Sequence, residues 1–362
     1  MSVGAMDSVR DTPPHFAPTS DFARELQGEV AAYLREARRA GRPATGDPRL
    51  LAKAGCLLVW FGASYGALLA APTWGMALVA AVSLAFAAAA LGFGVFHDAN
   101  HATLFRHCAA NRQAARLCSV LLGPSRVFWR IKHQVFHHRS PNVTGWDDDV
   151  DARGFLRLTP DYPWAPRFRH QQVQACLFYG LNTIEWFFWK DFACLVRGRL
   201  NRWQEARLSR GEQMELILGK ALYFALMVAP PFLLLPLPWA LGAFVLFHFV
   251  FSWVLTAVFQ LAHLTPGMSF GDVHPGDDWA MHQMRTTANF ATRSRWITWF
   301  TGGLNHQIEH HLFPQVAHTH YPALRPIVRK AAVRHGLPYH DLGSMRSALR
   351  QHFALLRRLG AG

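Results

Sequence analysis

The fold is decided by residues 54–97, which read AGCLLVWFGASYGALLAAPTWGMALVAAVSLAFAAAALGFGVFH and contain no Asp, Glu, Lys or Arg over 44 positions. As a helix at 1.5 Å per residue this stretch would reach about 66 Å, whereas one crossing of a bilayer core needs about 30 Å. It is therefore long enough for two membrane spans, with a turn signal, PTW, at residues 72–74. A second uncharged stretch, residues 221–271, runs for 51 positions and is interrupted by PLPW at 236–239.

These two stretches predict an all-α integral membrane protein with four transmembrane helices in two hairpins. The expected spans are residues 51–71, 74–96, 216–235 and 239–262. Both hairpin turns are almost free of charge, and the basic residues lie before, between and after the hairpins. The positive-inside rule therefore places those three segments together in the cytoplasm, as a cytosolic helical cap.

Composition supports this class of protein and excludes others. The chain has 362 residues, of which 51% are hydrophobic and only 17% are charged, where soluble domains carry about 25% charged residues. This apolar content excludes intrinsic disorder, and the five cysteines do not make a disulfide scaffold. The net charge of +14 fits the anionic inner leaflet of a membrane. Because no nucleic-acid-binding motif accompanies it, no nucleic acid partner is expected.

The expected organisation is one membrane domain between two shorter pieces. Residues 1–50 form a cytosolic or interfacial N-terminal segment, residues 51–345 a single domain, and residues 346–362 a C-terminal tail. Within the first piece, residues 21–40 predict an amphipathic helix that lies either on the membrane surface or on the cap. The aromatic-rich residues 171–196 contain charges, which favour an interfacial helix over a fifth span.

Histidines carry the chemistry. Eight of the 20 lie near the cytoplasmic ends of the predicted spans or in the segments between them: His97, His101, His133, His137, His138, His263, His310 and His311. A spacing of four places two imidazoles on one face of a helix, as a shared metal requires. Eight imidazoles are too many for one ion, so two metals are expected. No cysteine lies in the clusters, which argues against structural zinc and iron–sulfur centres.

The remaining histidines are expected to have other roles. His248 lies in the middle of the fourth span, where a neutral core histidine bonded to a neighbouring helix is favoured over a functional group. Five more lie in the basic C-terminal region and are expected to be solvated: His318, His320, His335, His340 and His352.

The pattern resembles the membrane fatty acid desaturase family over nearly the whole chain. The motifs that carry the resemblance are FHDANH at 96–101, WRIKHQVFHH at 129–138, WDDDV at 146–150 and GGLNHQIEHHLFP at 302–314. The resemblance implies that the eight histidines are ligands of a non-haem diiron centre. The third motif, with Gln307 at its first position, is similar to that of the front-end desaturases and of bacterial linoleoyl-CoA desaturase-like proteins.

The family likeness implies an O2-dependent enzyme that introduces a cis double bond into a fatty acyl chain. The chain would be presented as acyl-CoA or as acyl-lipid, at the cytoplasmic face of what we expect to be a bacterial plasma membrane. Because 50 residues are too few for a fused haem domain, a separate electron donor is expected, a ferredoxin with its reductase. The same scaffold leaves a hydroxylase, ketolase or acetylenase open, and from another class a non-enzymatic metal- or haem-binding membrane protein.

Further residues receive provisional roles around this centre. Possible additional ligands, or groups that orient ligand rings, are Gln307, His306, Asp98, Asn100 and Glu309. The acidic run at residues 147–149 could also orient imidazoles through their second nitrogen, or be a solvated loop. A basic rim that could receive a substrate headgroup or an electron donor comprises Arg126, Arg130, Lys132 and Arg139.

Overall fold

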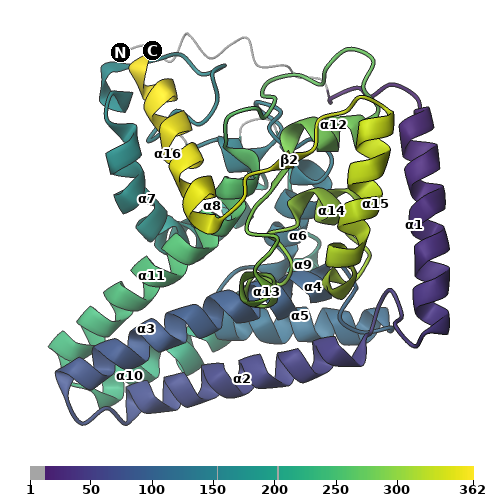
Figure 1. Cartoon of the computed structure of the whole chain (residues 1–362). Helices are drawn as coiled ribbons and strands as arrows, with labels where there is room; N and C mark the ends of the chain where they lie inside the picture. The colour runs from purple at the N-terminus through teal and green to yellow at the C-terminus, as the bar shows by residue number, and fades with distance from the viewer. Residues whose placement is uncertain (1–12, 153, 202–203) are drawn as a thin grey trace.

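The computed structural model describes residues 13–152, 154–201 and 204–362, and almost all regular structure in them is helical (Figure 1). The α-helices are α1 (Asp21–Arg39), α2 (Pro48–Leu69), α3 (Trp74–Leu91), α4 (His97–Asn100), α5 (Cys108–Leu122), α6 (Arg126–Arg130), α7 (Gln171–Glu185), α8 (Asp191–Arg197), α9 (Arg210–Tyr223), α10 (Ala229–Leu234), α11 (Leu237–His263), α12 (Trp279–Thr286), α13 (Arg295–Phe300), α14 (Gln307–Leu312), α15 (Tyr321–Arg334) and α16 (Met345–Ala361). Four π-helical segments are η1 (Gly92–Phe96), η2 (Ile131–His137), η5 (Trp186–Lys190) and η6 (Phe224–Val228). Three 3-10 turns are η3 (Asp148–Val150), η4 (Pro166–Phe168) and η7 (His318–His320), and two short parallel strands are β1 (Ala288–Asn289) and β2 (His340–Asp341).

The four predicted membrane spans are confirmed. In the described residues, four helices are long and apolar enough to cross a membrane, at Pro48–Leu69, Trp74–Asn100, Arg210–Leu234 and Leu237–His263. Each predicted boundary lies within six residues of the observed one. The two hairpin turns lie at the same end of the bundle, at the lower left of Figure 1, and the cap elements lie at the other end.

Local sequence explains where these helices start and how closely they pack. The side chain of Asp47 accepts a hydrogen bond from the Arg49 amide at the start of α2, and Thr73 caps α3 in the same way. Alanines at every turn of α3 are buried, and α3 contacts both α2 and α11. Small side chains allow this close approach of helix backbones within a membrane.

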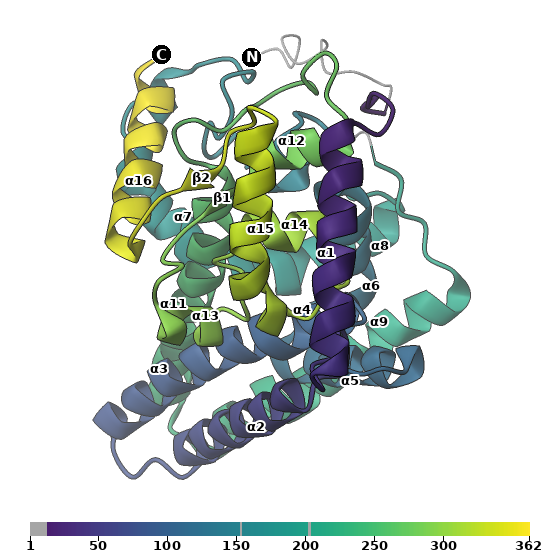
Figure 2. The same ribbon diagram turned by 45° about the vertical axis from the view of Figure 1, so that its right-hand side comes forward.

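Helix α1 packs on the cap. Phe22, Leu26 and Val30 are buried in one cluster with Leu324 and Val328 of α15. Figure 2 shows α1 and α15 side by side. Of the two positions expected for residues 21–40, the structure therefore supports packing on the cap rather than on the membrane surface.

The segment from α7 to α8 is not among the four candidate spans of the described residues, in agreement with the interfacial helix expected there. Helix α7 packs along α11, while Val173, Leu177 and Leu181 are exposed on its other face. The expected C-terminal tail includes most of α16, residues 345–361, which packs against α7 and α11.

Candidate metal centre

The eight predicted ligand histidines converge from four elements and are all buried, none with more than 7% of its surface exposed. His97 and His101 follow the π-helical end of the second span, and His263 is the last residue of α11. Histidines of the second motif lie on or beside η2, and those of the third motif lie on α14.

Two groups of imidazoles form, each with ligand atoms within 4.8 Å of one another. The first group comprises His97, His101, His133 and His310, and the second comprises His137, His263 and His311. In the first group, the Nε2 atoms of His97 and His310 lie only 3.2 Å apart. Two imidazole nitrogens approach this closely when a proton or a shared cation lies between them.

His138 lies between the two groups. Its ring centre is 4.8 Å from that of His101 and 4.4 Å from that of His311. Its Nε2 lies 3.1 Å from the Nε2 of His133. The π-helical register explains this contact, because residues five apart share a face in a π-helix, and the His138 amide donates to the His133 carbonyl. The α-helical spacing expected for His133 and His137 is thus replaced by a wider turn.

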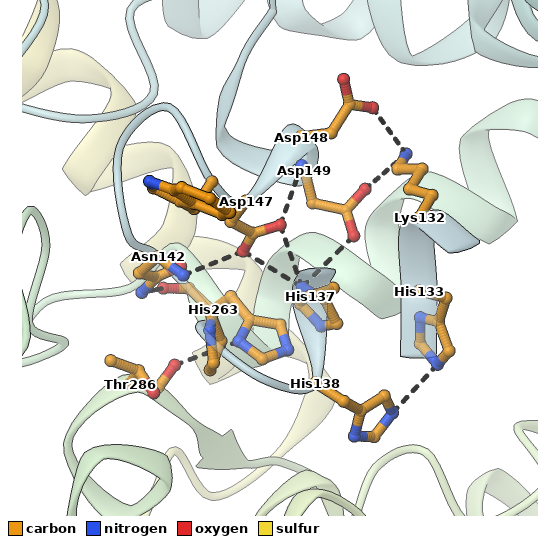
Figure 3. A network of polar contacts seen from close by, with 12 residues as sticks. Lys132, His133, His137, His138, Asn142, Asp147, Asp148, Asp149, His263 and Thr286 are labelled. Carbon is orange, nitrogen blue, oxygen red and sulfur yellow. Dashed lines mark hydrogen bonds and ion pairs between the residues drawn. The ribbon is translucent and has the colours of Figure 1, made fainter. Parts of the chain in front are cut away.

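Four of the rings are oriented through their Nδ1 atoms. His137 Nδ1 lies 3.0 Å from a carboxylate oxygen of Asp147, and His263 Nδ1 lies 3.0 Å from the carbonyl oxygen of Thr286 (Figure 3). His310 Nδ1 lies 3.1 Å from the Tyr321 hydroxyl, and His311 Nδ1 lies 2.9 Å from Gln283 Oε1. An Nδ1–H donor leaves Nε2 with its lone pair, which is the form that binds a metal.

Burial keeps most of these rings neutral. It lowers the pKa well below the usual value in five of them: His101, His133, His138, His310 and His311. His137 is the exception: although burial acts to lower its pKa, the Asp147 and Asp149 carboxylates outweigh burial and raise it. Neutral imidazole is the state that a metal ligand requires.

The donor set fits metal ions. The Nε2 atoms of His101, His137 and His311 are buried and have no hydrogen-bond partner, and neither do the Nδ1 atoms of His97 and His138. An unsatisfied buried polar atom costs about 1–3 kcal/mol. Cations at the centres of the two groups would satisfy the Nε2 atoms of His101, His137 and His311, and all-imidazole donor sets suit iron, zinc or copper.

The acidic run beside the second motif is buried in part and paired. Asp149 lies 3.4 Å from His137 Nδ1 and 2.6 Å from Lys132 Nζ, and Asp148 pairs with both Lys132 and Lys190. Figure 3 shows these carboxylates facing the lysine on one side and His137 on the other. Of the two alternatives for residues 147–149, this geometry favours groups that orient a ligand ring.

The residues predicted as a basic rim have the following surroundings. Lys132 is engaged in this network, and Arg126 shares the Glu215 carboxylate with Arg116. Arg130 pairs with Glu212, and Arg139 is exposed. Three of these four cations thus already contact carboxylates of the described residues.

The other provisional residues surround the centre in different ways. Gln307 Nε2 lies 3.2 Å from His263 Nε2, so this amide reaches the second group. Asn100 donates from its side chain to the Phe96 carbonyl. Glu309 accepts hydrogen bonds from Asn289 and Tyr339; burial raises its pKa to about 7, although these bonds act to lower it. His306 is buried, and its Nε2 lies 3.5 Å from Thr298 Oγ1. It belongs to neither ligand group of the described residues.

The expectation of solvated histidines in the C-terminal region is wrong for three of them. His318, His320 and His352 are each at most 5% exposed. His318 Nδ1 lies 2.7 Å from Asp98 Oδ2, and His352 Nδ1 lies 2.7 Å from the Leu264 carbonyl oxygen. Composition suggested an exposed basic region, but the cap folds these residues inward against the spans.

His248 behaves as expected for a core histidine bonded to a neighbouring helix. Its Nδ1 lies 3.0 Å from the Thr183 hydroxyl of α7. Sequence reasoning missed Tyr321, Gln283 and Thr286, which orient ligand rings, because none of them lies in a motif.

Comparison with known proteins places this arrangement in a family. The sequence model described as "Fatty acid desaturase" matches residues 72–343. A protein named sn-1 linoleoyl-lipid 6-desaturase from Synechocystis sp. is 30% identical over 357 residues, which cover 95% of this chain and 97% of the relative. A protein of the same name from Arthrospira platensis is 27% identical over 95% of this chain and 94% of the relative. An acyl-lipid (8-3)-desaturase from Physcomitrium patens is 31% identical over 79% of this chain and 61% of the relative.

Proposed function

Because the chain belongs to the fatty acid desaturase family and is a fatty acyl desaturase, we propose that it uses two iron ions and O2 to introduce a cis double bond into a membrane acyl-lipid, as a front-end enzyme. The observation that carries the diiron proposal is the pair of buried imidazole groups with unpartnered nitrogens. The names of the relatives from Synechocystis sp., Arthrospira platensis and Physcomitrium patens support an acyl-lipid substrate.

The eight histidines would hold the metals, with His138 between the two groups. Bound iron supplies the oxidising power against an unactivated C–H bond, which no side chain has. The chain's own part is to fix the ligand rings. Asp147, Tyr321 and Gln283 each hold an Nδ1 atom so that the opposite nitrogen faces the centre of its group.

Aromatic residues form the apolar wall beside the first group. Trp129 stacks on His133 with ring centres 4.3 Å apart, and Phe96 packs edge-on against Trp129 at 5.2 Å. Phe259 also packs edge-on against His133, with ring centres 6.1 Å apart. Such a wall excludes water and gives a hydrocarbon chain a surface on which its position relative to the metals is fixed.

The two electrons are proposed to come from a ferredoxin and its reductase, and the metal centre to face the cytoplasm of a bacterial plasma membrane. Two features support this arrangement. A net charge of +14 suits an acidic soluble partner. The cap and the basic segments lie at the same end of the spans, as the positive-inside rule requires of a cytoplasmic face.

Product analysis tests the proposal. The full chain is expressed in a host that lacks polyunsaturated lipids, linoleate is supplied, and the lipids are analysed by gas chromatography and mass spectrometry. We expect a new double bond on the carboxyl side of the existing one, and no new product from the His310→Ala variant at equal protein level. An alcohol or a ketone as the product would contradict desaturation, and a new bond on the methyl side would contradict the front-end type.

A further inference from the structure

A basic cavity opens beside the first turns of α2. Its volume is about 650 Å³, and its walls come from α2, α13 and the turn that precedes α15. Three cations line it: Arg49, Lys53 and Arg295. Its described lining residues include no Asp or Glu, so the cavity has a net positive charge.

Lys53 is a buried cation whose Nζ has no carboxylate of the described residues within 4.0 Å. Its side chain is 7% exposed, and its Nζ lies 3.1 Å from His318 Nε2 and 5.6 Å from the centre of the Trp299 ring. His318 Nδ1 lies 2.7 Å from an Asp98 oxygen, so its Nδ1–H donates there and its Nε2 accepts from Lys53. An ammonium has three N–H donors, and a buried charge is costly unless it is paired. An anion in the cavity would supply the missing acceptor.

The two arginines differ in what they already contact. Arg49 donates to the Asp47 carboxylate, whereas Arg295 is exposed and forms no ion pair with any described residue within 4.0 Å. Lys53 and Arg295 are therefore the two lining cations that are free to take an anion from outside.

The position of the cavity fits the depth expected for lipid headgroups. It opens where α2 enters its membrane span, and Trp296 and Trp299 of α13 lie beside it. Trp296 is 61% exposed and stacks against Trp299, with ring centres 5.3 Å apart. Exposed tryptophans are typical of the boundary between headgroups and hydrocarbon.

We propose that this cavity binds the phosphodiester of a membrane phospholipid, with Lys53 and Arg295 as its cationic contacts, and that this phospholipid carries the acyl chain that is desaturated. The second part of this proposal, that the bound phospholipid is the substrate, rests on the proposed function. The hydrogen-bonded series Lys53, His318 and Asp98 links the bound phosphate to the turn that carries His97. Headgroup position is thereby fixed relative to the metal centre.

Binding is measured without turnover, so that this proposal and the proposed function fail separately. Purified full-length protein in neutral detergent is titrated with a fluorescent short-chain phosphatidylglycerol. Loss of one charge-assisted contact is expected to weaken binding roughly tenfold in Arg295→Ser. Arg293→Ser is the matched control, because Arg293 is also exposed, lies two residues away and does not line the cavity. Equal affinity in both variants would overturn the site.

Competition experiments with different lipids identify the chemical group that the cavity recognises. A short-chain phosphatidylcholine should compete with the probe, because it carries the same phosphodiester, whereas a galactolipid with the same acyl chains should not. Competition by the galactolipid as strong as that by the phospholipids would contradict phosphate recognition. If acyl-CoA competes better than either phospholipid and loses this advantage in Arg295→Ser, the ligand of the cavity is a soluble thioester and the phospholipid proposal is wrong.

A second measurement of lipid binding leaves the cations that line the cavity unchanged. Cys56 lines the cavity and is exposed. In a variant in which the other exposed cysteines, Cys108 and Cys176, are serine, its alkylation by N-ethylmaleimide should be slowed several-fold by short-chain phosphatidylglycerol. An unchanged alkylation rate at lipid concentrations that saturate the fluorescence titration would contradict binding in this cavity.

Discussion

At the scale of single residues, the centre depends on hydrogen bonds that orient four of its imidazole rings. Asp147 illustrates this, because its two carboxylate oxygens lie 3.0 and 3.1 Å from His137 Nδ1 and also accept from the amides of Asn142 and Asp149. The residue shapes the loop and orients the ligand at the same time.

Asp147→Asn should therefore lower iron affinity and activity without unfolding the protein. The amide keeps the shape of the carboxylate but loses its charge, and loss of such a partner costs about 10- to 100-fold in metal affinity or activity. Iron content and product yield are measured together, with Glu36→Gln on the exposed face of α1 as the control. Full iron occupancy in Asp147→Asn would show that the carboxylate does not orient His137.

The third motif offers a contrast between neighbouring histidines. His310→Ala should abolish activity, because its Nε2 belongs to the first ligand group, while membrane insertion is unchanged. His306→Phe should retain activity and iron, because His306 lies outside both groups of the described residues and contacts Thr298. Loss of iron in His306→Phe would make His306 a ligand and shift the register of the motif.

At the scale of elements, close approach of backbones holds the first and third motifs together. Gly302 has a φ of +60°, and a Cβ at this position would lie 2.5 Å from the carbonyl oxygen of Phe93 in η1. The segment η1 leads directly into His97, so this contact sets the distance between two ligand-bearing elements.

Gly302→Ala should therefore reduce thermal stability and iron content more than Gly336→Ala. Gly336 has a similar φ of +63° but nothing within 4 Å of its Cβ position, so it shares the backbone strain and lacks the clash. Strain alone costs about 1 kcal/mol or more. Thermal unfolding in detergent and iron analysis compare the two variants, and equal losses would show that contact with η1 is unimportant.

His352 connects α16 to α7 and to the end of α11, and it gives this connection a pH dependence. Burial lowers its pKa to about 4 from 6.5, although its bond to the Leu264 carbonyl acts in the opposite direction. The unfolded chain binds the proton more readily between these values, so the stabilising contribution is complete above pH 6.5 and is lost as the pH falls toward 4. The full contribution is on the order of 3 kcal/mol.

Thermal unfolding of wild type and His352→Gln between pH 7.5 and 5 measures this contribution. The variant should be less stable at pH 7.5, and the difference between the two proteins should narrow as the pH falls. A difference that stays constant over this range would show that His352 is not buried in its neutral form.

At the scale of the whole molecule, sequence predicted the spans because a charge-free stretch has few alternatives in a bilayer. It also predicted eight ligand histidines from their spacing and motifs, and the structure brings all eight together in the cap and at the ends of two spans. The contact of His133 with His138 could not be predicted, since spacing alone does not reveal a π-helical turn. The burial of His318 and His352 was also missed, because it depends on how the cap folds onto the spans.

The two imidazole groups make the central claim a statement about the whole molecule, since each group draws on residues more than 100 positions apart in the chain. Its most direct test is the iron content of purified wild-type protein, measured by mass spectrometry against protein concentration from amino-acid analysis. Two irons per chain with no haem absorption are the predicted result. One iron per chain, zinc in place of iron, or a haem band in the visible spectrum would contradict it.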